Sequence, residues 1–180
     1  MQLVLKIVLF CLALFLGYLV YDSIVSEIEY RAEVDLVEDQ VKDRLLMIKE
    51  AQMAYKDKYG YFTGSFDSLK YFVKTGSISI LMEYGDKDDS TSVYSFERIN
   101  VPLTDTIFKG YPIEKLDKIP PMDTASFEMA AATITTNAIS VPVFQVKDKY
   151  PFNKQRRNPN HPKKPLQIGS LSAATYSGNW

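Results

Sequence analysis

Residues 3 to 21 read LVLKIVLFCLALFLGYLVY, and this apolar stretch determines the organisation of the whole chain. Lys6 is its only charged residue. About 20 helical residues cross the hydrocarbon core of a bilayer, which is roughly 30 Å thick. Residues 1–22 are therefore predicted to form an uncleaved signal anchor that spans a membrane.

A cleaved signal peptide and a lipoprotein signal are the two alternatives for this segment. A cleavage site needs small residues, whereas leucine and tyrosine surround Gly17. Cys11 follows Leu9 and Phe10 in the middle of the apolar run, where a lipoprotein signal would place small residues. Because Lys6 precedes the span and acidic residues follow it, the positive-inside rule places the N-terminus in the cytoplasm and the remaining chain outside.

The same helix is expected to continue beyond the membrane as a stalk, residues 23–58. No proline or glycine occurs between Tyr18 and Tyr59. Apolar residues recur mostly at steps of three and four, which is helical periodicity. They are Ile24, Ile28, Val34, Val37, Val41, Leu45, Ile48, Ala51 and Tyr55.

The first part of this stalk is acidic. It includes Glu33, Asp35 and Glu38, against Arg31 as the one basic residue. Such a block is either a solvated helix face or a surface that binds a basic partner or a neighbouring copy. Glu33, Asp35 and Glu38 are therefore candidate partner-binding residues.

Residues 59–180 are predicted to form a small α+β domain outside the membrane. Gly60 is expected to end the long helix. A short helix over 65–75 is expected between Ser65, a favoured N-cap residue, and Gly76, a favoured residue after a helix end.

The residues after Gly76 change to a period of two, which predicts antiparallel strands. Pro142 places the last strand of the second hairpin at a sheet edge or at a bulge. The predicted hairpins comprise residues 78–84 with 94–97, and residues 127–133 with 139–143 around a turn near Asn137; a last short strand covers 166–168.

The tail contains an irregular basic arm that is rich in proline, residues 147–165. No acidic residue follows Asp148. The arm is either a polar loop or a site for an anionic ligand, bound through Arg156 and Arg157: lipid headgroups, a polysaccharide or the acidic stalk of a neighbour. Nucleic acid is not expected as a partner, because the net charge is -1 and the arm is predicted to lie outside the cytoplasm.

Residue types that are common in catalytic and metal-binding sites are scarce in this chain. One cysteine and one histidine exclude an intramolecular disulfide framework and metal centres rich in these residues. His161 lies in the basic arm with no nucleophile nearby, and no phosphate-binding glycine loop or Gly-x-Ser-x-Gly elbow occurs. The chain is therefore predicted not to be an enzyme, with no catalytic residues, no cofactor and no small-molecule substrate.

One spacing matches a calcium-binding loop in part. Asp86, Asp88, Ser90 and Glu97 fall at ligand positions of an EF-hand pattern, but Thr91 stands where that pattern requires glycine. The flanking segments are predicted strands rather than helices. A hairpin turn with solvated acidic residues explains the spacing more simply, so no metal site is predicted.

The order of the elements resembles type IV pilins and the pseudopilins of type II secretion. The similarity lies mainly in residues 45–76. The resemblance implies that one face of the long helix packs against the sheet, through Leu45, Ile48, Ala51 and Tyr55. It assigns the exit from this helix to Tyr59-Gly60-Tyr61-Phe62, and the packing turn that follows to Leu69 and Phe72.

The resemblance implies a pilin-like domain on a long helix, and hence a non-enzymatic structural or assembly protein. It implies a component of a cell-envelope complex for secretion, adhesion or motility. The protein would be single-pass in a bacterial inner membrane, with its C-terminal domain in the periplasm. Its partners would be the membrane, other envelope proteins and copies of itself. The alternative is a membrane-tethered binding module that recognises an anionic ligand through the basic arm.

Overall fold

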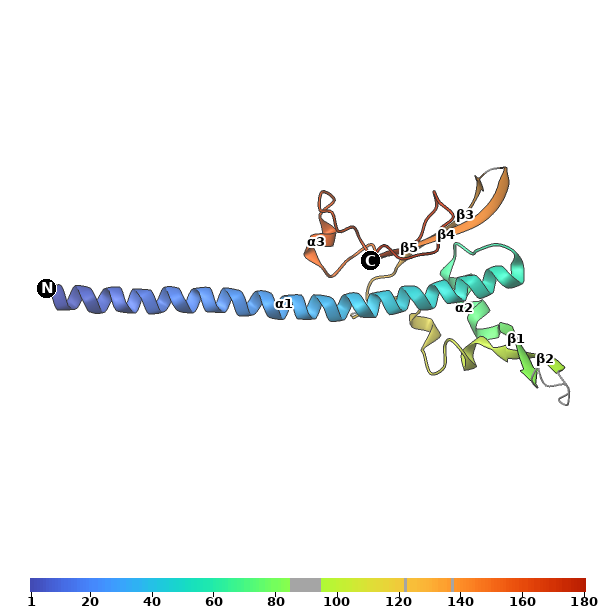
Figure 1. The fold of residues 1–180 in the computed structure, drawn as a ribbon, viewed down its shortest axis with the longest axis horizontal. Helices are drawn as coiled ribbons and strands as arrows, with labels where there is room; N and C mark the ends of the chain where they lie inside the picture. Colours follow the sequence, from blue (N-terminus) through green and yellow to red (C-terminus); the bar gives the residue numbers. More distant parts are fainter. Residues whose placement is uncertain (85–94, 122, 137) are drawn as a thin grey trace, which may run out of the picture. The chain divides into compact units, whose positions relative to one another are not determined.

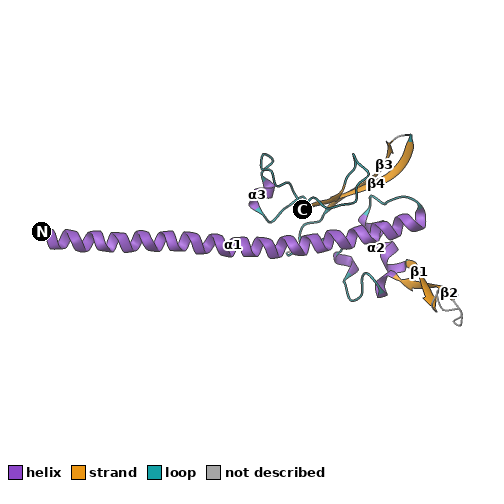
Figure 2. Cartoon of the chain, in the orientation of Figure 1, coloured by secondary structure: helices purple, strands orange, loops and turns teal. Residues whose placement is uncertain are grey.

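The structure is a computed structural model that describes residues 1–84, 95–121, 123–136 and 138–180. It is an α+β protein with one long N-terminal helix and small antiparallel sheets (Figures 1 and 2). The chain divides into two compact units, Met1–Asp39 and Gln40–Trp180. Helix α1, Gln2–Tyr59, begins in the first unit and ends in the second, and it runs unbroken through the predicted boundary between anchor and stalk.

Helix α1 ends where the sequence predicts. The backbone N–H of Gly60 donates to the carbonyl of Lys56 at 2.7 Å, and Gly60 has a φ of 83°, in the left-handed region that favours glycine. A buried side chain of α1 then fixes the following turn. The amide Nε2 of Gln52 donates to the carbonyl of Thr63 at 2.7 Å, and its Oε1 accepts from the Thr63 N–H at 3.1 Å.

Replacing Gln52 by leucine tests this turn. Gln52 is fully buried and Thr63 is 7% exposed, so leucine would leave the Thr63 backbone groups buried without a partner. We expect the free energy of unfolding to fall by about 1–3 kcal/mol. Urea unfolding of the full chain in detergent, followed by near-ultraviolet circular dichroism, measures this. The exposed Gln40→Leu is the control, and an equal loss in both variants would contradict the interpretation.

Helix α2, Phe66–Thr75, packs Leu69, Phe72 and Val73 into the interior. Ser65 occupies the predicted N-cap position, but its side chain makes no capping hydrogen bond. Gly76 follows the helix as predicted, yet its backbone is extended rather than left-handed. A Cβ at Gly76 would lie 2.5 Å from the Phe72 carbonyl oxygen, so close packing requires glycine there.

The strands form two antiparallel sheets, and both predicted hairpins are confirmed. In the first sheet, β1, Ser77–Tyr84, pairs with β2, Ser95–Pro102. In the second, β3, Glu128–Thr136, pairs with β4, Ile139–Lys147, and β4 pairs with β5, Gln167–Gly169. The predicted turn at Asn137 and the predicted acidic turn between β1 and β2 lie outside the described residues.

The prediction that Pro142 marks an edge strand or a bulge is wrong for β4 as a whole, because β4 is the middle strand of its sheet and its register with β3 continues past Pro142 without a bulge. However, β5 pairs only with Gln145–Lys147, so among the described strands Pro142 has a neighbour on one side alone, where it faces Thr133. The carbonyl of Pro142 accepts a hydrogen bond from the Tyr176 hydroxyl at 3.0 Å. Proline is tolerated here because no strand of the described residues pairs with this part of β4 on its second side.

The core of the second unit combines one face of α1 with α2 and the three-stranded sheet. Phe62, in the turn after α1, lies with its ring centroid 4.7 Å from that of Phe144 on β4. The ring of Tyr176 stacks on Phe144 at 5.9 Å. The other fully buried apolar side chains are Leu45, Ile48, Ala51, Leu69, Val73, Leu103, Leu116, Val143, Val146 and Ile168.

Segments between the two sheets also pack on α1. The 3-10 helices η1, Leu103–Asp105, and η2, Ile113–Lys115, connect β2 to β3. The Nη1 of Arg44 on α1 donates to the carbonyls of Lys115 at 2.6 Å and Lys118 at 2.9 Å. These hydrogen bonds hold the segment between β2 and β3 against α1.

Candidate functional site

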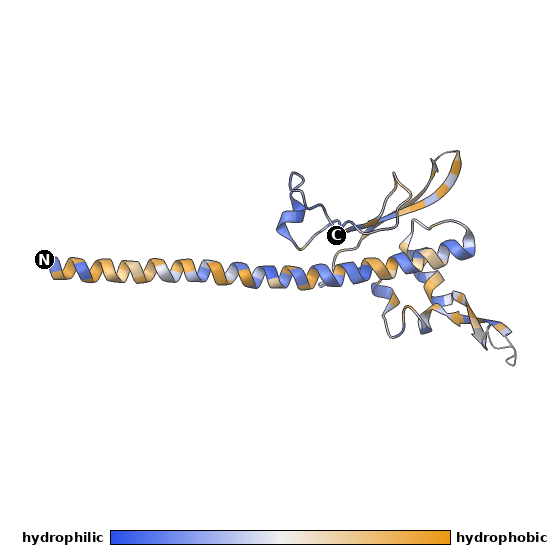
Figure 3. Ribbon diagram, viewed as in Figure 1, coloured by the Kyte–Doolittle hydropathy of each residue, from blue (hydrophilic) through white to orange (hydrophobic). Residues whose placement is uncertain are grey.

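The N-terminal part of α1 is the candidate membrane-spanning surface. This helix contains an 18-residue window with a mean hydropathy of 2.7, none of which is buried in the structure. Figure 3 shows the hydrophobic colouring along this part of the helix and mixed colouring farther on. The helix is therefore long and apolar enough to span a membrane. Cys11 is exposed within it.

The predicted acidic surface lies on α1 in the first unit. Glu33 and Asp35 are exposed, and Glu38 is half-buried. One ion pair on this segment joins the Nε of Arg31 to the Oε1 of Glu27 at 2.9 Å, and both side chains are largely exposed. An exposed pair of this kind contributes little to stability. The partner-binding role of Glu33, Asp35 and Glu38 stays a prediction.

The basic arm is more ordered than the predicted irregular loop. It contains α3, Lys154–Arg157, where the Oδ1 of Asn153 accepts from the Gln155 N–H at 2.9 Å as an N-cap. Asp148 is 2% exposed, and its Oδ1 accepts from the Tyr150 N–H at 2.9 Å. Short-range side-chain bonds of this kind could not be assigned from the proline-rich sequence.

The two predicted ligand-binding arginines help to close this arm. Arg156 is 8% exposed, and its Nη1 donates to the carbonyl of Lys164 at 2.6 Å. The Nε of exposed Arg157 donates to the carbonyl of Pro151 at 2.6 Å. Both also line a pocket of about 370 Å³ together with Lys149, Tyr150, Pro151 and Pro165. The arginines therefore have a structural role, and ligand binding through them stays a prediction.

The remaining predicted positions do not form a site in the described part of the chain. Asp86, Asp88 and Ser90 lie outside the described residues, while Glu97 is exposed on β2 opposite Met82. Among the described residues, no group of three or more His, Cys, Asp and Glu side chains could hold a metal ion. The Nδ1 of half-buried His161 accepts from the Lys163 N–H at 3.1 Å, which is a local turn.

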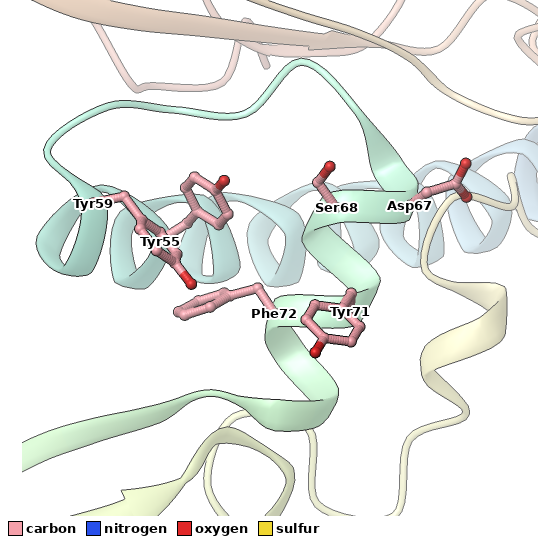
Figure 4. A pocket seen from close by; sticks show the side chains of 6 residues that line it. All are labelled: Tyr55, Tyr59, Asp67, Ser68, Tyr71 and Phe72. Carbon is pink, nitrogen blue, oxygen red and sulfur yellow. The ribbon is translucent and has the colours of Figure 1, made fainter.

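A tyrosine pocket that the sequence did not reveal lies between the end of α1 and the start of α2. It has a volume of about 390 Å³. Figure 4 shows that its wall comes from two helices, with Phe72 directed toward the tyrosines of α1. The lining residues are Tyr55 and Tyr59 from α1 and Asp67, Ser68, Tyr71 and Phe72 from α2. We call this the tyrosine pocket.

Helical spacing places these side chains together. Tyr55 and Tyr59 are four residues apart, so they lie on one face of α1, and Asp67 and Tyr71 share a face of α2 in the same way. The ring centroids of Tyr55 and Tyr59 are 4.6 Å apart, and Phe72 meets them edge-on at 5.2 Å and 5.8 Å. Tyr61 meets Tyr55 edge-on at 5.8 Å.

The electrostatics of the tyrosine pocket come from ring faces and one carboxylate. Burial and a hydrogen bond with Tyr61 raise the pKa of Tyr55, so its hydroxyl stays protonated at neutral pH. Asp67 is exposed and makes no ion pair with any residue that the structure describes. The Nζ of Lys58 lies 5.6 Å from the ring centroids of both Tyr59 and Phe72, within the range of a cation–π contact.

A second electrostatic cluster, near α2, is structural. Lys70 on α2 forms an ion pair with Asp117, and the hydroxyl of Ser126 donates to the same carboxylate at 3.2 Å. Burial alone would raise the pKa of Asp117, but the hydrogen bond and charge of Lys70 and the bond from Ser126 bring it below the usual value.

This lowered pKa predicts a pH-dependent contribution to stability. The stabilisation is present above the ordinary aspartate pKa of about 4 and is lost as the pH falls through the lower folded-state value. We expect Asp117→Asn to lose about 1–3 kcal/mol at neutral pH, and the difference from the unsubstituted protein to shrink below about pH 4. Urea unfolding at several pH values measures this, with exposed Asp105→Asn as control. A difference that stays constant down to about pH 2 would contradict it.

Comparison of the chain with protein-family models, with curated proteins and with solved structures finds no match.

Proposed function

We propose that this chain is a non-enzymatic, single-pass membrane protein that acts as a structural or assembly component of a cell-envelope complex. The observation that supports it most is the apolar, exposed N-terminal part of α1, which continues as one helix into a folded α+β unit. Such a chain anchors a domain to a membrane and presents its surfaces to other proteins. The α+β unit lies in the periplasm and the N-terminus in the cytoplasm.

The resemblance to pilins and pseudopilins gives this proposal its finer form. The face of α1 that the resemblance assigns to packing includes Leu45, Ile48 and Ala51, all fully buried. The helix is followed by a short helix and by antiparallel sheets, in the order that the resemblance implies. The complex would be an apparatus for secretion, adhesion or motility.

Crosslinking in intact membranes, followed by mass spectrometry, tests the assembly role. We expect crosslinks from the acidic part of α1 to other envelope proteins or to a second copy. The triple variant Glu33→Lys, Asp35→Lys and Glu38→Lys should lose them, because charge reversal repels a basic partner. The control reverses exposed acids of the second unit, Asp105→Lys and Glu128→Lys. An unchanged set of crosslinked proteins in the triple variant would overturn the role of this surface.

One observation favours the alternative function, recognition of an anionic ligand. Lys149 and Arg157 are exposed and line the same pocket of the basic arm. With heparin as a polyanionic probe, Lys149→Gln should lower the salt concentration at which the full chain elutes, because it removes one charge from the pocket. Lys109→Gln, an exposed lysine elsewhere in the unit, is the control. Equal elution of both variants would remove this alternative.

A further inference from the structure

We propose that the tyrosine pocket is a binding site for an arginine side chain presented by an exposed segment of a partner protein. The proposal rests on the proposed role in assembly, because it specifies the chemistry of one partner. It is carried by three features: aromatic rings from two helices, an aspartate that lines the pocket without an ion pair to any described residue, and a lysine of the chain already placed against two of the rings.

The aromatic wall suits a planar cation. The π-face of a tyrosine or phenylalanine ring is negative, and it attracts an ammonium or guanidinium group within about 6 Å. Phe72 meets Tyr55 and Tyr59 edge-on, and the rings of Tyr55 and Tyr59 are tilted by 44° to each other, so these contacts orient the three rings before a ligand arrives. Tyr71 lines the pocket from α2 and is 70% exposed, so its ring is accessible to a ligand.

Lys58 shows that these rings accept a cation in this structure. Its Nζ lies 5.6 Å from the centroids of Tyr59 and of Phe72. Lys58 is not one of the residues that line the pocket, and the volume of about 390 Å³ leaves room for a second cation. The positive charge of Lys58 also opposes that second cation, and its removal should therefore strengthen binding.

Asp67 brings a negative charge to the pocket. It lines the pocket, is exposed and has no ion pair among the described residues, and Figure 4 shows its carboxylate directed away from the rings of Tyr55 and Tyr59. The hydroxyls of Ser68 and of the tyrosines add further hydrogen-bond acceptors. A guanidinium stacks on aromatic rings and donates several hydrogen bonds in one plane, whereas an ammonium is a compact charge that holds its water more strongly. The arrangement therefore favours arginine over lysine.

Binding is measured on the full chain in detergent micelles, with ¹³C-labelled tyrosine rings followed by nuclear magnetic resonance. The probe is a five-residue peptide with a central arginine, flanked by glycine and serine. The matched control peptide carries citrulline, which has the same shape without the charge. We expect the arginine peptide to shift the signals of Tyr59 and Tyr71, and the citrulline peptide to bind about tenfold more weakly.

Variants separate this site from a general attraction for cations. Asp67→Asn and Tyr71→Leu should each weaken binding of the arginine peptide by about threefold to tenfold. Their controls, Asp105→Asn and Tyr84→Leu, change an exposed acid and an exposed tyrosine elsewhere and should leave it unchanged. Lys58→Gln should strengthen binding by about threefold, the effect of removing one like charge about 6 Å away in water.

Three results would overturn the proposal. They are equal binding of the citrulline peptide, displacement of the arginine peptide by a neutral oligosaccharide, and shifts confined to tyrosines outside the pocket. Equal binding by Asp67→Asn and by its control variant would also overturn it. The crosslinking experiment on the acidic part of α1 uses a different surface, so failure of the tyrosine pocket and failure of the assembly role are distinguishable.

Discussion

Two aspartates placed in the apolar part of α1, Leu9→Asp with Leu12→Asp, are expected to abolish membrane integration. Both leucines lie within residues 3 to 21 and are at least half exposed. An aspartate at the centre of a membrane span costs about 2.5–3.5 kcal/mol. Two would cost roughly 5–7 kcal/mol, which shifts the partition from membrane to water by about four orders of magnitude.

A second double variant tests whether two aspartates elsewhere in the same helix have the same effect. Leu36→Asp with Leu46→Asp replaces two exposed leucines of the same helix beyond the apolar stretch. Membranes are sedimented after an alkaline carbonate wash. We expect the first double variant to leave the pellet or to be degraded, and the second to remain in it. Retention of both in the pellet would contradict a membrane span at residues 3 to 21.

The largest effect on folding is expected from Phe144→Ala. Phe144 is fully buried on β4 and packs against the rings of Phe62 and Tyr176, which also contact each other. Removing a buried phenylalanine ring leaves a cavity and costs about 3–5 kcal/mol. That is a large part of the roughly 5–15 kcal/mol by which a typical domain is stable.

Phe96→Ala is the matched control, because Phe96 lies on β2 and is 67% exposed. A surface change of this kind is expected to stay within about 0.5 kcal/mol. Urea unfolding in detergent, monitored by near-ultraviolet circular dichroism, compares the two variants. If Phe96→Ala proved as destabilising as Phe144→Ala, the assignment of the core would be wrong.

Much of the fold follows from local sequence signals. The absence of proline and glycine between Tyr18 and Tyr59 and the left-handed Gly60 define the long helix and its end. The period of two predicts β1 with β2 and β3 with β4, because alternation depends only on neighbouring residues. The position of β4 in the middle of its sheet was missed, because β5 comes from a distant part of the chain.

The tyrosine pocket could not be predicted in the same way. The pairs Tyr55 with Tyr59 and Asp67 with Tyr71 are visible as residues four apart. Which faces meet depends on the turn after α1, and this turn is set by the buried contacts of Gln52 with Thr63. The same holds for Arg156, whose burial depends on contacts such as that with the Lys164 carbonyl rather than on local charge.

The proposal that α1 anchors the unit Gln40–Trp180 outside the cytoplasm is tested most directly by cysteine labelling in cells. In a Cys11→Ser background, one variant carries Ser172→Cys and another carries Gln2→Cys; both positions are exposed. A maleimide that cannot cross the inner membrane is expected to label Ser172→Cys in cells with a permeabilised outer membrane. Gln2→Cys should be labelled only after lysis. The reverse pattern, or equal labelling of both before lysis, would contradict the proposal.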